Sequence, residues 1–120
     1  MVASSRHPFR VLVALGLSAL ALSCGGEGLG DPTGSTCPTD STLTYENFGQ
    51  QFFSSHCLSC HSGKESPSLI SVEAIRAEAS EIDRAAAAGP DAVNTYMPEE
   101  GSVAEAERRQ LGEWLACGAP

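Results

Sequence analysis

The sequence predicts an all-α fold, a small bundle of about three or four short helices. In three stretches the apolar residues recur at spacings of three and four positions, which is typical of helices with one buried face. Residues that cap helices precede these stretches, and glycine or proline follows the later ones. No stretch shows the alternation of apolar and polar residues expected of a strand, and 120 residues suffice for one small domain.

The first predicted helix begins after Thr44, whose hydroxyl can cap it, and ends at about His56. Leu43 and Phe48 have the spacing of a hydrophobic staple. Gly49 lies inside this helix, where glycine costs about 1 kcal/mol relative to alanine. A close approach by another helix would explain this glycine; the alternative is a tolerated glycine near a frayed end.

A second helical stretch begins after Ser71 and ends before Gly89-Pro90, as one helix or as two short ones. The apolar stripe of this stretch consists of Val72, Ile75, Ala79 and Ile82. The charged residues that fall mostly off the stripe are expected to be solvated: Arg76, Glu78, Glu81 and Asp83.

The last predicted helix follows a capping box that starts at Ser102 and has Glu105 as its acidic member. It runs to about Ala116, with Leu111, Trp114 and Leu115 on one side, and Gly118 closes it.

The beginning of the chain has the pattern of an export signal. A basic stretch, Met1–Arg10, precedes an apolar run over residues 11–22 that is too short to cross a bilayer as a helix. The run ends before Cys24 as in bacterial lipoproteins, which are cleaved before this cysteine and lipidated on its thiol, although Ala21 replaces the expected leucine. The alternative is an ordinary signal peptide cut nearby. Both predict an exported protein, and the first predicts a periplasmic one, lipid-anchored to a bacterial membrane.

These signals divide the chain into three parts: a signal peptide over 1–23, a flexible linker over 24–43 that is rich in Gly, Ser, Thr and Pro, and a domain over 44–120. The net charge of −8 makes nucleic-acid binding improbable on physical grounds. An acidic face could steer a basic redox partner, or the charge could serve solubility alone.

The most informative stretch is Cys57-Leu58-Ser59-Cys60-His61, a C-x-x-C-H run, which is the pattern of covalent haem attachment. Two thiols at this spacing can bond the two vinyl groups of one haem. The histidine that follows can ligate the iron from below the ring. The sequence therefore predicts one haem c, held by Cys57 and Cys60, with His61 as an axial ligand.

Two other uses of this run are weaker. A structural zinc site would need a fourth ligand, usually from a second pair such as C-x-x-C. A thioredoxin-like motif would need a βαβ pattern around it. Neither pattern is present, because Cys37 and Cys117 are single and far apart and no strand is predicted.

Cys37 and Cys117 remain as a matched pair once the other cysteines are assigned to lipid and haem. In an oxidising compartment we expect them to form a disulfide, worth about 4.5 kcal/mol in the chain-entropy model. The alternative is two free thiols, which are less common outside the cytosol.

Elimination indicates the second iron ligand. Beyond the leader, Met97 is the only methionine and His56 the only histidine besides His61. His56 directly precedes the motif and Lys64 closely follows it, so neither easily reaches the opposite face of the haem. A thioether is a soft ligand that raises the reduction potential. We expect Met97 to ligate the iron; the alternative is a methionine that only packs.

The stretch from about Leu43 to Gly118 resembles a small class I cytochrome c, a mono-haem c-type cytochrome, of the bacterial lipoprotein type. Gly49 and Phe53 stand eight and four residues before the motif, where that family has a glycine and an aromatic residue. Leu111 and Trp114 match a leucine and an aromatic residue on its last helix.

The resemblance implies that the first and last helices cross at Gly49. It also implies that the segment with Pro67 and Leu69 supplies a carbonyl that orients His61, and that Tyr96-Met97-Pro98 is the loop of the distal ligand. The Cys37/Cys117 pair and the long acidic helix after Ser71 depart from the family pattern.

The expected function is one-electron transfer by a haem c with His61 and Met97 as axial ligands, with a redox protein as partner. No small-molecule substrate is implied, and Glu99-Glu100 reads as a solvated turn rather than a catalytic pair. The alternatives are a haem c subunit of a larger oxidoreductase, or a peroxidase or gas sensor if Met97 is not a ligand.

Overall fold

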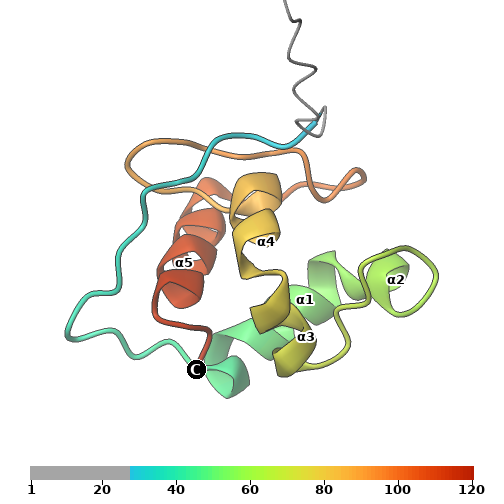
Figure 1. The fold of residues 1–120 in the computed structure, drawn as a ribbon, viewed down its shortest axis with the longest axis horizontal. Helices are drawn as coiled ribbons and strands as arrows, with labels where there is room; N and C mark the ends of the chain where they lie inside the picture. Colours follow the sequence, from blue (N-terminus) through green and yellow to red (C-terminus); the bar gives the residue numbers. More distant parts are fainter. Residues whose placement is uncertain (1–27) are drawn as a thin grey trace, which may run out of the picture.

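The computed structural model describes residues 28–120, and the predicted signal peptide over 1–23 and the lipidation of Cys24 lie outside them. The described part is helical and contains no strand, only an isolated bridge between Ala88 and Val93. Its elements are the π-helix η1 (Tyr45–Gly49) and the α-helices α1 (Gln50–His56), α2 (Leu58–His61), α3 (Val72–Ala77), α4 (Ala79–Ala86) and α5 (Glu105–Ala116). The all-α prediction is confirmed for these residues, with more helices than the expected three or four (Figure 1).

The first helix begins where the sequence predicts. The Thr44 hydroxyl accepts a hydrogen bond from the Asn47 backbone amide at 3.2 Å, and the Asn47 side chain accepts one from the Thr44 amide at 2.8 Å. This reciprocal capping box starts η1, which continues into α1 through Gly49. The turn that follows is α2, so the C-x-x-C-H run is itself helical.

The second helical stretch is two short helices that meet at Glu78. The Ser71 hydroxyl accepts a hydrogen bond from the Ala74 amide at 3.2 Å and caps α3. Glu78 has φ −103° and ψ 11°, outside the helical values, and α4 starts after it. Ile75 and Ile82 are buried in the core, as their place on the apolar stripe predicts.

The last helix begins later than the capping box predicted. Its N-cap is Ala104, which has no side-chain capping bond, and α5 starts at Glu105. Ser102 is exposed, whereas Val103 is buried in the core. The prediction for Ser102 is therefore wrong, because the segment before α5 is held by the burial of Val103 and not by a local hydrogen bond. The end at Ala116 is as expected, and Gly118 follows with φ +87°.

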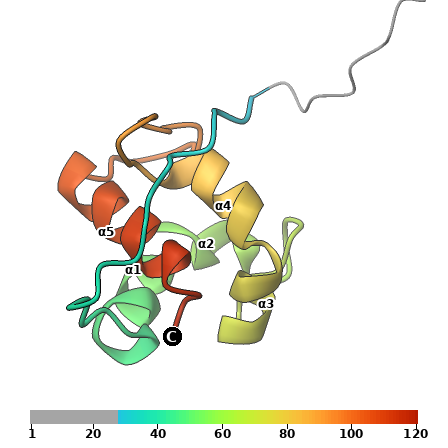
Figure 2. The same cartoon turned by 60° about the vertical axis from the view of Figure 1, so that its left-hand side comes forward.

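Residues 28–43 lie along the bundle as an extended strap (Figures 1 and 2). Thr33 has no exposed surface, and its amide and hydroxyl both donate to the carboxylate of Asp83, at 2.8 and 2.6 Å. The amide of Gly30 donates to the carbonyl of Arg84 at 2.8 Å. The prediction of a flexible linker over 24–43 is thus wrong for 28–43, because long-range hydrogen bonds fix a segment whose composition is typical of linkers. The same bonds show that Asp83 is not simply solvated.

A disulfide joins the strap to the end of α5. Cys37 and Cys117 are bonded, as the sequence predicts, with their Cα atoms 4.7 Å apart. The Ser41 hydroxyl donates to the carboxylate of Glu113 at 2.6 Å, which adds a second link between the strap and α5.

The core lies where η1 and α1 meet α5. Trp114 has no exposed surface, and its ring lies against Phe48 and Phe53, with centroids 6.1 and 6.0 Å apart. A Cβ atom placed on Gly49 would lie 2.7 Å from Cζ2 of Trp114. The expected close approach of another helix at Gly49 is therefore confirmed. Helix α4 packs on the side of α5, and both views show the two helices next to each other (Figures 1 and 2).

Candidate functional site

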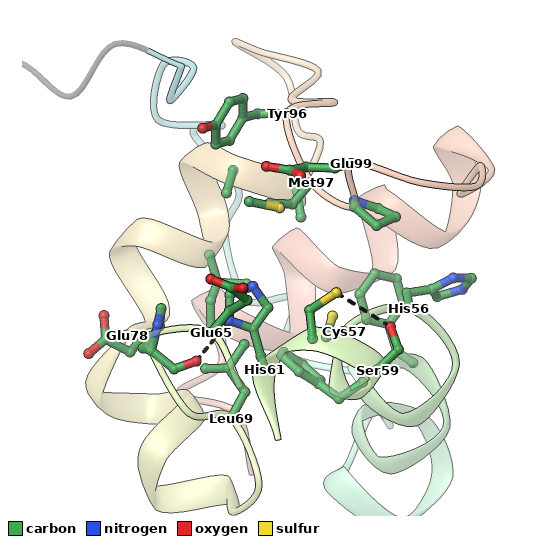
Figure 3. A pocket seen from close by; sticks show the side chains of 18 of the residues that line it. His56, Cys57, Ser59, His61, Glu65, Leu69, Glu78, Tyr96, Met97 and Glu99 are labelled. Atoms are coloured by element: carbon green, nitrogen blue, oxygen red, sulfur yellow. Dashed lines mark hydrogen bonds between the residues drawn. The ribbon is translucent and has the colours of Figure 1, made fainter. Parts of the chain in front are cut away.

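A cavity of about 750 Å³ opens between the C-x-x-C-H helix and the loop that follows α4. Its volume is within the range of small-molecule and cofactor sites. Apolar side chains from several elements line it, including Phe52, Phe53, Leu69, Ile82 and Met97. Cys57, Cys60 and His61 also line it, so the three residues of the motif share one cavity. Figure 3 shows Cys57 and His61 among its lining side chains.

Helix α2 places the two cysteines and the histidine together. Amides of Cys60 and His61 both donate to the carbonyl of Cys57, at 3.2 and 2.9 Å. This turn puts positions i, i+3 and i+4 on one face, which is the arrangement needed for one ligand group to meet all three side chains. Both thiols are free, Cys60 exposed and Cys57 partly buried. Burial raises the pKa of the Cys57 thiol to about 12, because desolvation disfavours the thiolate.

The imidazole of His61 is oriented by a backbone carbonyl. Its Nδ1 lies 2.8 Å from the carbonyl oxygen of Pro67. Because a carbonyl can only accept, Nδ1 carries a proton, and in the neutral imidazole this leaves Nε2 with a free electron pair. The amide of Leu69 donates to the carbonyl of His61 at 2.8 Å and closes the loop between them. This is the orientation of His61 that the resemblance implied, and it makes Nε2 the atom available to a metal.

Met97 lies on the other side of the cavity from His61 (Figure 3). It is half-buried and packs against the core. Its amide donates to the carbonyl of Ala85 on α4 at 2.8 Å, and its carbonyl accepts a hydrogen bond from Arg108 on α5, also at 2.8 Å. Helix α4 thus holds the backbone amide of Met97, and helix α5 holds its carbonyl.

Arg108 supports this site from behind Met97, and the sequence analysis did not single it out. Only 4% of the residue is exposed, and Nη1 donates to the carbonyls of Ala86, Asn94 and Met97. Burial lowers the pKa of the Arg108 guanidinium from its ordinary value, because desolvation disfavours the charge. Its position three residues before Leu111, on the buried face of α5, is the sequence signal that could have revealed it.

The other two candidates for the second ligand, His56 and Lys64, each have a polar partner, although His56 also lines the cavity. His56 lies at the end of α1, where its ring packs on Phe52 with centroids 5.0 Å apart. Its Nε2 is 3.7 Å from a carboxylate oxygen of Glu107. The ammonium of Lys64 is exposed and donates to the carbonyl of Ser59 at 3.2 Å. Both side chains thus have a partner, whereas Met97 bonds to other residues of 28–120 only through its backbone.

Carboxylates are the charged groups at the walls and mouth of the cavity. The acidic residues that line it are Glu65, Glu78, Glu81, Glu99 and Glu100, and no lysine or arginine of residues 28–120 lines it with them. Glu99 and Glu100 are exposed, in agreement with the expectation of a solvated turn. Glu78 is half-buried at the cavity wall, so the expectation that it is solvated is wrong.

The arrangement does not support the zinc and thioredoxin interpretations. Among residues 28–120, no group of three or more histidine, cysteine, aspartate or glutamate side chains is placed to hold a metal ion. The described residues also lack the parallel strands of a thioredoxin-like unit. A cavity with two thiols, one oriented imidazole and a thioether instead fits a group that brings its own in-plane ligands, as haem does.

No family model matches the chain, and neither a curated protein nor a solved structure is significantly similar to it. In the described segment, no helix is both long and apolar enough to span a membrane.

Proposed function

We propose that this protein is a one-electron carrier with one covalently bound haem c. The observation that carries the proposal is the oriented imidazole of His61, which shares a cavity of about 750 Å³ with both thiols of the C-x-x-C-H run and with Met97. The resemblance to small class I cytochromes c supports the proposal further, since it rests on the same motif and on Gly49 and Trp114 in the helices around it. The donor set is one imidazole and one thioether, the pair found in cytochromes that transfer electrons.

Four residues would hold the haem. Cys57 and Cys60 would hold it covalently through thioethers, since both thiols are free and lie one helical turn apart. His61 would bind the iron through Nε2, because Nδ1 donates to the carbonyl of Pro67. Met97 would bind from the other side through its sulfur.

When bound, the haem supplies an Fe(II)/Fe(III) couple. The chain's own residues keep the surroundings of that couple constant. Two ligands fixed to separate helices resist movement, and the buried side chains of Phe53 and Leu69 keep water away. An apolar shell and a thioether ligand both favour the reduced state. The imidazole of His61 bonds to a backbone carbonyl and not to a hydroxyl or thiol, unlike the base of a hydrolytic nucleophile–base pair.

The proposed partner is a redox protein that docks weakly at the cavity mouth, where the carboxylates would favour a basic surface. We also propose export to the periplasm and a lipid anchor at Cys24, on the sequence evidence alone. Attachment at that position would keep the carrier close to a bacterial membrane.

Absorption spectra of protein made together with cytochrome c maturation machinery test the proposal. We expect a haem that stays attached on a denaturing gel, a low-spin spectrum in both oxidation states, and a charge-transfer band at the red end of the oxidised spectrum. Replacing both cysteines, as Cys57→Ser/Cys60→Ser, should abolish covalent attachment, and a Ser54→Ala variant serves as the matched control. Colourless protein would refute the haem assignment.

The Met97→Ala variant separates the carrier from an enzyme or a sensor. Its loss of the red band and a fall in reduction potential would support Met97 as ligand. A high-spin oxidised spectrum in the unchanged protein would instead favour a peroxidase or gas sensor. Co-purification of a large partner in constant ratio would favour a subunit of an oxidoreductase.

A further inference from the structure

Arg108 is a buried cation with no carboxylate partner. The ion pairs of residues 28–120 join other side chains, His56 with Glu107 and Arg109 with Glu105. Removing a guanidinium from water without a counter-ion is costly, so a structure that keeps one needs a compensating interaction. Its neighbour Arg109 shows the ordinary alternative, an exposed side chain paired with an acid one helical turn away.

Three backbone carbonyls replace the missing counter-ion. Nη1 of Arg108 lies 2.7 Å from the carbonyl oxygen of Ala86, 2.9 Å from that of Asn94 and 2.8 Å from that of Met97. One nitrogen has two hydrogens for three acceptors, so at least one hydrogen is shared. The Nε atom is buried and has no hydrogen-bond partner. The guanidinium therefore concentrates its bonding on the end of α4 and on the loop that carries Met97.

The loop has few other attachments near its ligand. Asn94 is fixed by its side-chain amide, which donates to the carbonyls of Asp31 and Asp83 at 2.8 and 2.9 Å. Met97 itself is held by its amide to Ala85 and by Arg108. Tyr96, between them, is exposed over 44% of its surface. Without the guanidinium, the carbonyl of Met97 would lose its partner and the loop would keep only one bond at the ligand position.

We propose that Arg108 is a positioning residue for Met97, which holds the loop so that the thioether stays directed at the iron and which favours the reduced state by its buried charge. This inference rests on the proposed function, because it requires Met97 to be a ligand. Charge-assisted hydrogen bonds are stronger than neutral ones, so the three carbonyls are held firmly. A positive charge in a low-dielectric site favours Fe(II) over Fe(III), because it repels the less positive iron more weakly.

Competition by added imidazole tests the positioning. In the haem-loaded protein, imidazole binds only when Met97 leaves the iron. Arg108→Met has a side chain of comparable length but no donors, and we expect the apparent Kd of imidazole to fall about tenfold, which corresponds to about 1.4 kcal/mol. Arg108→Lys keeps the charge but not the planar guanidinium, so its Kd for imidazole should lie between those of the unchanged protein and Arg108→Met. The control is Arg109→Met, which should bind imidazole as the unchanged protein does.

Reduction potentials provide the second measurement. The potential should fall in Arg108→Met, fall less in Arg108→Lys, and stay unchanged in Arg109→Met. A residue with only a structural role would lower the denaturant midpoint of unfolding and leave both the imidazole Kd and the potential at their original values. If Arg108→Met gives no folded protein, the Arg108→Lys variant decides by the same two measurements.

The outcomes separate this inference from the proposed function. If the unchanged protein shows the red band and both Arg108 variants keep the original imidazole Kd and potential, the role of Arg108 is refuted and the function stands. If the unchanged protein itself lacks the band and binds imidazole without competition, Met97 is not a ligand, and the proposed ligation and the role of Arg108 are both refuted.

Discussion

The absence of a side chain at Gly49 lets the ring of Trp114 lie directly against the backbone of the first helix. A Cβ atom at this glycine would lie 2.7 Å from Cζ2 and 2.9 Å from Cη2 of the indole. Trp114 has no exposed surface and cannot move outwards without opening the core. The contact joins η1 and α1 to α5, and these helices support opposite parts of the proposed haem site.

Replacing Gly49 by alanine should therefore destabilise the protein. Alanine gains about 1 kcal/mol in helix propensity, but a clash with a buried ring costs typically about 1–3 kcal/mol or more. We expect the clash to prevail and the free energy of unfolding to fall by about 1–2 kcal/mol. Denaturant unfolding followed by circular dichroism measures it.

The matched control for Gly49→Ala is Ser54→Ala, an exposed site on α1. It should change the free energy of unfolding by no more than about 0.5 kcal/mol. A Gly49→Ala protein as stable as the original, or more stable, would show that the indole relaxes away from the helix.

Removing the Cys37–Cys117 disulfide should destabilise the protein more than Gly49→Ala does. The bond links residues 80 positions apart, and the chain-entropy model assigns such a loop about 4.5 kcal/mol. We expect the double variant Cys37→Ala/Cys117→Ala to lose about 3–5 kcal/mol in the free energy of unfolding. Thermal unfolding of the variant and of the original protein, with and without a reducing agent, measures the difference. If reduction leaves the original protein's midpoint unchanged, the bond does not contribute in this way.

Local patterns in the sequence predicted the helix starts that depend on local hydrogen bonds. Thr44 and Ser71 cap their helices, because a hydroxyl at this position needs only the amides of the next turn. The box at Ser102 has the same pattern but fails, since the burial of Val103 determines how the chain enters α5. Local sequence patterns predict local hydrogen bonds, and tertiary packing can prevent such a bond from forming.

Features that depend on residues far apart in the chain were not predictable in this way. The strap over 28–43 has the composition of a linker, and bonds to residues 50 or more positions away, among them Asp83 and Arg84, give it a fixed place. Arg108 is charged and would ordinarily be assigned to the surface; three distant carbonyls hold it inside. The candidate site was predictable to a greater extent, because the C-x-x-C-H run is contiguous and Met97 followed by elimination.

The contact between the strap and α4 gives a further prediction, at Thr33. Thr33→Val keeps the shape of the side chain but removes the hydroxyl that donates to the carboxylate of Asp83. Hydrogen bonds to a charged group contribute about 1.5–3 kcal/mol, and we expect the free energy of unfolding to fall by about that amount. Thr36→Val, at an exposed position on the same strap, is the control. Equal stability of the two variants would contradict a structural role for the strap.

The pKa of Cys57 gives a prediction on the chain made without haem. Its ordinary value of 9.0 rises to about 12, because the thiol is shielded from water and the thiolate is disfavoured. Only the thiolate reacts readily with iodoacetamide. At about pH 9, roughly one Cys57 side chain in a thousand would be ionised. We expect the exposed Cys60 to be alkylated first, with Cys57 protected until the chain unfolds, as measured by mass spectrometry of peptides.

The same shift makes the stability of the haem-free chain depend on pH. The folded state keeps the Cys57 proton up to about pH 12, whereas the unfolded chain loses it near pH 9.0. The unfolded state thus binds fewer protons in this window, and the free energy of unfolding falls as the pH rises through it. The Cys57 proton's contribution to the free energy of unfolding is fully present below pH 9.0, where both states keep the proton. Cys57→Ala should remove this part of the decline, while Cys60→Ala should retain it. Parallel curves for the original protein and Cys57→Ala above pH 9.0 would show that the thiol is hydrated in the folded chain.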